Sequence, residues 1–379
     1  MVFRKHEQLT VKYGITIFYC IVIGWIAAAS VKKPACNWDM LPYMGVVLSY
    51  ENLDVKEMHA IVYATAKAQV PVVYFNRMTD SSNTYRSLLA NNADAFYTQL
   101  PFYVVKPLYT RMAWLFYKSG IALTTATVWP SAIAYLITGM LLYGWLRKYG
   151  SSVYACVAAL CLMLSPPLLN VAGLSSPDAL SGLFVFAAVY VLTEMKSVSV
   201  AFALLLLAVF TRLDNVLACF GLMTAVFFTG KWNAVIPASR KLLYFGLLLV
   251  AFFSVTFAVR SFGWTVFFYP AFMKQLNVSL TAGKGFAWSA YLQLAKAQLT
   301  TGLYFSFVSF FGLMLTMLFW NVLPFHFSRL TADQTLALLF VVIMLLRFML
   351  QPLVADRIYS PYYLSVAVFL VRKYSPQPI

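Results

Sequence analysis

Four aspartates stand at or near the ends of long apolar segments, where an ionised side chain needs a partner or a cavity. They are Asp39 in NWDMLPY, Asp178 in LSSPDALSG, Asp214 in FTRLDNVL and Asp356 in VADRIYSPYY. A charge near hydrocarbon costs about 2.5 to 3.5 kcal/mol even on lenient insertion scales. In the topology argued below, all four share one side of the membrane. Their convergence predicts a polar site at the outer mouth of a helix bundle.

Each of these aspartates also has a structural interpretation. Asp39 and Asp178 stand where a helix is predicted to begin, and aspartate is a favoured N-cap residue. Asp214 and Asp356 each have an arginine within two residues, so a local ion pair or a packing role competes with a functional one. The sequence leaves these alternatives open.

Arginine is the side chain best suited to bind a phosphate near these acids, because its planar fork can bond two oxygens at once. Arg357 is the first candidate, and Arg212 in the TRLD stretch is the second. Arg260, Lys274 and Lys284 are further candidates, although attraction to lipid headgroups is the commoner role of such lysines.

Aromatic residues beside the acids could present ring faces to a sugar. Trp38 and Tyr43 flank Asp39, and Tyr359 and Asp214 are further candidate substrate contacts. In a chain that is 17% aromatic, a place in the interfacial belt is the commoner role of any one ring. The three histidines are dispersed along the chain, so the sequence predicts no histidine-based metal site.

The elements that must position these residues are apolar helices. Of 379 residues, 62% are hydrophobic and 11% are charged, whereas a soluble domain is about 25% charged. This composition excludes a disordered chain, a disulfide scaffold and a soluble enzyme with a single anchor. The net charge of +16 lies mostly at segment ends, where anionic lipid explains it, so membrane lipids are expected as partners and nucleic acid is not.

Apolar runs of about 20 residues predict an all-α integral membrane fold with about ten transmembrane helices. Residues 1–379 are expected to form a single polytopic membrane domain. The expected spans lie near residues 13–29, 123–146, 153–173, 177–194, 197–212, 214–230, 241–259, 302–321, 334–351 and 360–371.

Lysine and arginine in the connections favour a cytoplasmic position for both termini, because positive charge accumulates in inner loops. Two large segments, residues 31–122 and 260–301, then lie on the outer side. Both carry helix-like spacing with polar faces, so we expect amphipathic interfacial helices in these outer loops.

Taken together, four patches resemble the GT-C superfamily of integral membrane glycosyltransferases. They are an aspartate soon after the first span (Asp39), an SSPD turn entering the fourth span (175–178), a TRxD element (211–214) and a DRIYSP loop before the last helix (356–361). No single patch is specific, and the resemblance rests on their order, their spacing and their common side of the membrane. In topology the resemblance covers the whole chain.

The resemblance implies a polyprenyl-phosphate-linked sugar as donor and a cell-envelope glycan or glycolipid as acceptor. It implies that Asp39 is the general base, with Asp178 as the next candidate catalytic residue. Many relatives carry paired acids in the first loop, whereas Asp39 has no acidic neighbour. No cofactor is therefore firmly implied, and dependence on a divalent cation, Mg²⁺ or Mn²⁺, stays open. A bacterial inner membrane with a periplasmic active site is the expected setting.

Other functions fit parts of the same pattern. A transporter or flippase of lipid-linked sugars matches the span count, but the candidate charges lie at one interface rather than at the bilayer midplane. A non-catalytic assembly protein gives no reason for an aspartate so soon after the first span. A ligase using a diphosphate-linked glycan is a near neighbour in chemistry. The sequence does not disclose the sugar, the acceptor or the stereochemical outcome.

Overall fold

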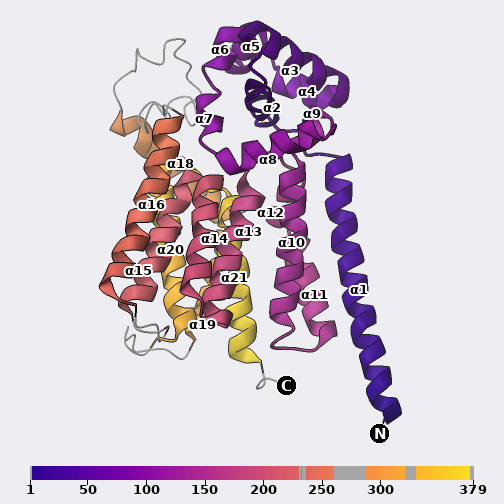
Figure 1. Ribbon diagram of the computed structural model, residues 1–379, viewed down its shortest axis with the longest axis vertical. Helices are drawn as coiled ribbons and strands as arrows, with labels where there is room; N and C mark the ends of the chain where they lie inside the picture. The colour runs from indigo at the N-terminus through magenta and orange to yellow at the C-terminus, as the bar shows by residue number, and fades with distance from the viewer. Residues whose placement is uncertain (1, 230–231, 233–235, 260–286, 321–329, 376–379) are drawn as a thin grey trace.

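The computed structural model describes residues 2–229, 232, 236–259, 287–320 and 330–375. Within these residues every regular element is a helix, and the one extended pairing is an isolated bridge between Ala35 and Leu174. Figure 1 shows a bundle of long, roughly parallel helices covered at one end by a cap of short helices. Both chain termini lie at the opposite end, which we call the termini end.

The bundle begins with α1, returns after the cap as α10, and then continues to the C-terminus. Its elements are α1 (Val2–Lys32), α10 (Trp129–Leu146), α11 (Ser152–Met163), α12 (Pro166–Ala172), α13 (Asp178–Tyr190), η1 (Val191–Met195), α14 (Val198–Thr211), η2 (Leu213–Asn215), α15 (Val216–Phe228), α16 (Ala238–Ala258), α18 (Trp288–Phe305), α19 (Val308–Phe319), α20 (Ala332–Leu350) and α21 (Asp356–Tyr374).

Five helical segments among the described residues are long and apolar enough to cross a membrane: 13–32, 123–146, 178–195, 238–258 and 332–350. A sixth exists if α11 and α12 form one span, although they meet at an angle of 74°. Pro166 and Pro167 explain that bend, because proline lacks the amide hydrogen that would continue α11. The structure therefore supports a polytopic helical membrane protein, and the count of ten spans stays a prediction.

The segment 31–122, which was predicted to lie on the outer side, forms most of the cap, and the cap contains a hydrophobic core of its own. At its centre lies α2, whose residues Met40 to Leu48 are all buried. The apolar face of α3, spaced at Met58, Val62 and Ala66, packs into the same core. The cap helices are α2 (Met40–Ser49), α3 (Val55–Gln69), α4 (Val72–Met78), α5 (Thr84–Asn91), α6 (Ala93–Tyr97), α7 (Pro101–Val104), α8 (Pro107–Lys118) and α9 (Leu123–Ala126).

In the second predicted outer segment, 260–301, the boundary with the next span differs from the predicted one. Helix α18 occupies its end and continues to Phe305, past the predicted start of the next span at residue 302. Residues 260–286 lie outside the described part of the chain.

The cap rests on the bundle through a small apolar joint of its own. Tyr43 from α2 and Tyr109 from α8 pack there against Ala179 and Leu183 of α13. Beside this joint the backbone amide of Ala35 donates to the carbonyl of Gly173 over 2.9 Å. These contacts bring the segment before α2 alongside the turn before α13, far apart in the sequence.

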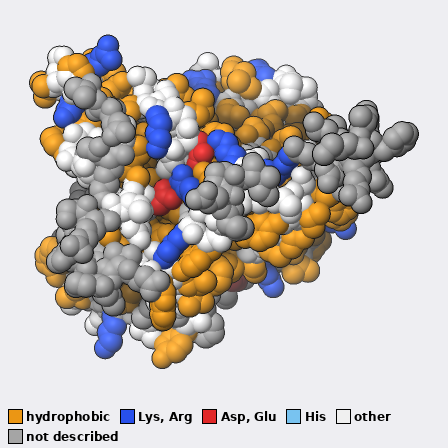
Figure 2. All heavy atoms as spheres, turned by 90° about the horizontal axis from the view of Figure 1, so that it is seen from below, with side chains coloured by type: hydrophobic (Ala, Val, Ile, Leu, Met, Phe, Trp, Pro, Cys, Tyr) orange, Lys and Arg blue, Asp and Glu red, His pale blue; other side chains and the backbone are white. Residues whose placement is uncertain are grey.

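At the termini end, an ionic network ties four helical elements together. Glu194 at the end of α13–η1 is its centre, and its side chain is 11% exposed. Figure 2, seen from this end, shows acidic side chains between lysine and arginine side chains in the middle of the face. Glu194 accepts from Trp145 Nε1 (2.8 Å), Tyr149 Oη (2.6 Å), Lys148 Nζ (3.1 Å) and Arg372 Nη1 (3.2 Å), and Arg372 also pairs with Asp333 (2.5 Å).

We expect Glu194→Gln to lower the melting temperature in detergent by several degrees. The change removes the negative charge that compensates Lys148 and Arg372, and an uncompensated partly buried cation is strongly unfavourable. Glu51→Gln is the matched control, because Glu51 pairs with Lys118 at 2.6 Å on the surface of the cap, where half of the lysine side chain is exposed. Equal shifts for the two variants would contradict a structural role for the network.

Candidate functional site

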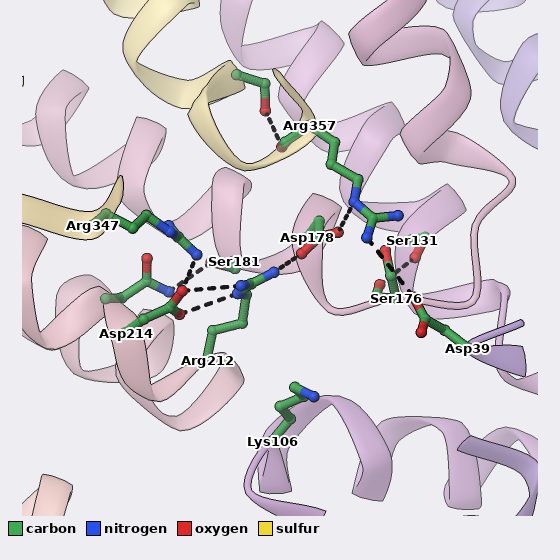
Figure 3. Close-up of polar contacts among 12 residues, drawn as sticks. Asp39, Lys106, Ser131, Ser176, Asp178, Ser181, Arg212, Asp214, Arg347 and Arg357 are labelled. Atoms are coloured by element: carbon green, nitrogen blue, oxygen red, sulfur yellow. Dashed lines mark hydrogen bonds and ion pairs between the residues drawn. The ribbon is translucent and has the colours of Figure 1, made fainter. Parts of the chain in front are cut away.

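A row of six charged side chains of alternating sign runs beneath the cap, from the joint into the bundle (Figure 3). Three carboxylates alternate with three guanidinium groups, so their formal charges cancel. Five segments of the chain supply them. In order, the row consists of Asp39, Arg357, Asp178, Arg212, Asp214 and Arg347.

The end of the row next to the cap is the more open one. Asp39 and Arg357 face each other there, with Oδ2 and Nη2 3.8 Å apart, and their side chains are 28% and 32% exposed. Asp39 accepts hydrogen bonds from Asn37 Nδ2 and Tyr103 Oη, both at 3.2 Å. Its carboxylate makes no cap to helix α2, so the N-cap interpretation of this side chain is wrong.

Asp178 lies deeper, and its side chain is only 1% exposed. One of its oxygens is bonded by Arg212 Nη1, and the other lies 2.9 Å from Arg357 Nε. It is the first residue of α13 and makes no side-chain capping bond, so here too the capping interpretation fails. The carboxylate instead joins two guanidinium groups from α21 and the end of α14.

The inner end of the row lies where α14 gives way to η2. Arg212 leaves the helical conformation there, with φ −154° and ψ 118°, and its Nε and Nη2 bond both oxygens of Asp214 at 3.1 and 3.0 Å. Arg347, from the apolar helix α20, pairs with the same carboxylate. Asn215 fixes the break by donating to Ser181 Oγ over 2.6 Å and to the Ala208 carbonyl over 2.8 Å.

The SSPD turn holds Asp178 in place through bonds to the start of α10. Ser175 Oγ lies 2.8 Å from Thr127 Oγ1, and Ser131 donates to the carbonyl of Ser176 over 2.8 Å. Gly173 just before the turn allows the close approach of the cap segment, because a Cβ there would lie 3.2 Å from the backbone nitrogen of Ala35. The turn is thus clamped between α10 and the segment that carries Asp39.

Lys106 approaches this row from the cap side (Figure 3). The residue before a proline avoids the helical conformation, and Lys106 precedes Pro107 with φ −122° and ψ 59°, which separates α7 from α8. Its Nζ donates to the Phe102 carbonyl over 2.9 Å and lies 4.7 Å from the centre of the Tyr103 ring. Burial, and then the nearby Arg212, lower the pKa of this ammonium to about 7.

Other residues that were predicted to belong to the site have packing or hydrogen-bonding roles in the structure. Trp38 packs edge-on to Tyr85 in the cap core, at 5.8 Å between ring centres. Tyr43 and Tyr359 are 2% and 3% exposed. Neither ring is therefore accessible to a ligand, contrary to the prediction that they contact substrate. The carboxylate of Asp356 accepts from the Phe307 amide at 3.0 Å and does not join the row.

Arg260, Lys274 and Lys284 lie outside the described residues. Of the predicted site residues that are described, the structure brings together Asp39, Asp178, Asp214, Arg212 and Arg357.

Two members of the site were not predicted. Arg347 is 4% exposed in a helix that is otherwise apolar around it, and this lone charge in LLRFML was the signal that could have revealed it. Lys106 lies within the segment 31–122, for which the sequence predicts interfacial helices, and the proline after it marks a break between α7 and α8.

This arrangement can hold a negatively charged group at its open end. The inner carboxylates are each bonded by arginine, whereas Asp39 and Arg357 retain exposed polar atoms side by side. Asp39 can accept a proton from a hydroxyl, and Arg357 can donate to an anion at the same place. Among the described residues no three metal-ligating side chains converge.

We expect Arg347→Leu to destabilise the protein by about 3 kcal/mol, because it leaves part of the buried Asp214 charge uncompensated. The double variant Asp214→Asn with Arg347→Leu should recover at least half of that loss, since Arg212 keeps Asp178 as a partner. Unfolding in mixed micelles measures both. A double variant no more stable than Arg347→Leu alone would show that the pair is not coupled.

Comparisons of the chain with protein-family models, with curated proteins and with solved structures found no match.

Proposed function

We propose that this chain is a membrane glycosyltransferase that moves a sugar from a polyprenyl-phosphate donor to a cell-envelope glycan or glycolipid. The observation that carries the proposal is the pairing of Asp39 with Arg357 at the open end of the charged row. A carboxylate that can take a proton stands there beside a guanidinium that can bind a phosphate. The transfer reaction needs both groups in one place.

In the proposed reaction the acceptor hydroxyl oxygen bonds to C1 of the sugar while the bond between C1 and the phosphate oxygen breaks. The electron pair of the broken bond leaves with the polyprenyl phosphate. The hydroxyl proton passes to the Asp39 carboxylate, which acts as general base. Arg357 stabilises the charge that develops on the leaving phosphate.

The contacts of the other predicted residues lead us to propose different roles for them. Arg212 is bonded by both Asp178 and Asp214, so we assign it to positioning rather than to the phosphate. Asp178 orients Arg357 through its Nε and leaves the outer nitrogens of the guanidinium for the donor. Lys106 takes the place of a second phosphate ligand, because its side chain lies on the cap side of this row and makes no carboxylate ion pair within the described residues.

The proposed setting is a bacterial inner membrane with the cap and the charged row on the periplasmic side. The termini end carries many of the basic residues that flank spans, which supports a cytoplasmic position for it. A cell-envelope polysaccharide such as O-antigen or exopolysaccharide is the proposed product class, by analogy with the superfamily that the sequence resembles. Retention or inversion at C1 is left to the product assay.

We expect Asp39→Asn to lower the rate of sugar transfer roughly a hundred- to ten-thousand-fold, which is the usual contribution of a general base. Purified protein is given a panel of radiolabelled polyprenyl-phosphate sugars and membrane glycolipids, and labelled product is counted. Asp94→Asn is the matched control, because Asp94 is an exposed aspartate on α6 of the same cap and should leave the rate unchanged.

Other outcomes of this assay would change the assignment of the base or the proposed function. Undiminished transfer by a folded Asp39→Asn protein would remove the base from Asp39 and make Asp178 the next variant to test. Absence of transfer from every donor, with movement of lipid-linked sugar across reconstituted vesicles, would reject the transferase and favour a flippase.

The donor kcat/KM of the wild type is expected to fall as pH rises through about 7. The Lys106 ammonium is present below its lowered pKa and is lost above it, so the phosphate loses a charged partner at higher pH. Lys106→Gln should have a donor kcat/KM about tenfold lower at pH 6 and should lack this decline. Lys118→Gln, at the exposed end of α8, is the control and should keep the wild-type profile. An unchanged decline in Lys106→Gln would assign the titration to another group.

A further inference from the structure

A groove lies between α1 and α10 near the termini end, far along α10 from the charged row. Its volume is about 470 Å³, which lies in the range of sites for small organic ligands, about 300 to 1,000 Å³. Two helices that can cross a membrane form its walls. It is lined by Thr16 and Cys20 from α1, by Met140, Tyr143 and Gly144 from α10, and by Arg147 and Lys148 just after α10.

The walls of this groove belong to the lipid-facing surface of the bundle. Met140 is 46% exposed, and Ile17 and Ile21 on the neighbouring face of α1 are 59% and 64% exposed. Gly144 leaves the space open, because a Cβ built there would meet no atom within 4 Å. In a membrane, lipid is the medium that reaches such a surface.

One end of the groove is polar and positively charged. Arg147 Nη1 lies 3.4 Å from Thr16 Oγ1, and Tyr143 Oη lies 2.9 Å from the same hydroxyl. No carboxylate among the described side chains lies within ion-pair distance of Arg147, whereas its neighbour Lys148 is paired with Glu194 at 3.1 Å. Among the described side chains, this corner therefore carries one positive charge without a carboxylate partner, beside two hydroxyl groups.

We propose that the groove binds an anionic phospholipid from the leaflet at the termini end, with its phosphate on Arg147 and one acyl chain between α1 and α10. A guanidinium can bond two phosphate oxygens, and the hydroxyls of Thr16 and Tyr143 provide polar groups for the glycerol region. Basic pockets between transmembrane helices commonly hold anionic headgroups. Cys20, Met140 and the open side of Gly144 offer an apolar path for the chain.

The bound lipid would act as a wedge that completes the packing of α1 on α10. Above the groove the two helices contact directly, where Tyr19 donates to the Gly139 carbonyl over 2.8 Å and stacks on Tyr143 at 4.6 Å. Within the groove the described contacts between the two helices are the polar ones of Thr16 with Tyr143 and Arg147, and no apolar packing accompanies them at Gly144. This inference does not depend on the proposed transferase activity, since it concerns the opposite end of α10.

The test measures which lipid the purified full-length chain retains. Protein in detergent is mixed with equal amounts of phosphatidylglycerol and phosphatidylcholine, and the bound lipid is counted by native mass spectrometry. We expect a preference for phosphatidylglycerol of about fivefold, the ratio that corresponds to one basic residue near an anionic lipid. Arg147→Gln and Gly144→Leu should each reduce that preference to near one, the first by removing the charge and the second by filling the groove.

Matched variants elsewhere on the bundle separate this site from general effects. Gly246 on α16 is also exposed with open space at its Cβ position, and Arg240 is an exposed arginine near the start of the same helix. Gly246→Leu and Arg240→Gln should keep the wild-type preference. Melting temperatures of all four variants establish that they are folded.

Three results would overturn the proposal. One is equal retention of the two lipids by the wild-type protein. Another is a preference that survives in folded Gly144→Leu, which would place the lipid elsewhere. The third is displacement of phosphatidylglycerol by an equimolar amount of polyprenyl phosphate, which would assign the groove to a carrier lipid instead.

Discussion

The alternation of charge along the row from Asp39 to Arg347 is the constraint on which the cap end of this structure depends. Moving one carboxylate or guanidinium out of water costs several kcal/mol, and only a close opposite charge offsets that cost. Asp178 meets this requirement by forming ion pairs with two arginines at once, and Asp214 does the same. Each inner charge therefore fixes the position of the next. The row connects α13, α14, α20 and α21 at a depth where apolar packing alone would leave their relative positions less defined.

The same requirement explains why the row is open at only one end. The last inner member, Arg347, lies inside an apolar helix and ends on Asp214, so the row cannot continue without another buried charge. At the other end Asp39 belongs to the segment that joins α1 to the cap, and it is held by Tyr103 from the cap itself. A change in how the cap sits on the bundle would therefore alter the exposed pair before it altered the buried pairs.

Sequence reasoning predicted the acids of the site well and its full composition less well. Asp39, Asp178 and Asp214 were expected to converge, because charged residues at the same ends of adjacent spans share one depth in the bilayer. Arg347 was missed because its partner is a residue 133 positions away, and an apolar pattern shows that a charge is unusual without showing what it meets. Lys106 was missed because a local break, rather than a periodic pattern, sets its direction.

Prediction of the details of the fold was limited by similar causes. The apolar run 153–173 predicted one span, but composition does not show the bend of 74° that the two prolines introduce. Asp356 illustrates the opposite error, since it was expected to converge with the other three aspartates because it also lies at the end of a span. In the structure its carboxylate instead accepts a hydrogen bond from the backbone amide of Phe307 at the start of α19, 49 residues away. Local sequence identifies residues that need a partner, whereas tertiary packing chooses the partner.

Neutrality of the row has a consequence for any anion that binds beside it. Each arginine within the row is already matched by a carboxylate, so an added phosphate would leave the site with excess negative charge. Lys106 stands outside the pairing and supplies the one further cation that the described residues place next to the row. Its lowered pKa, about 7, means that it can lose its proton when no anion is present and regain it when one arrives. A half-buried lysine near a balanced set of ion pairs thus lets one site be close to neutral both empty and loaded, which an additional arginine could not do because it stays charged.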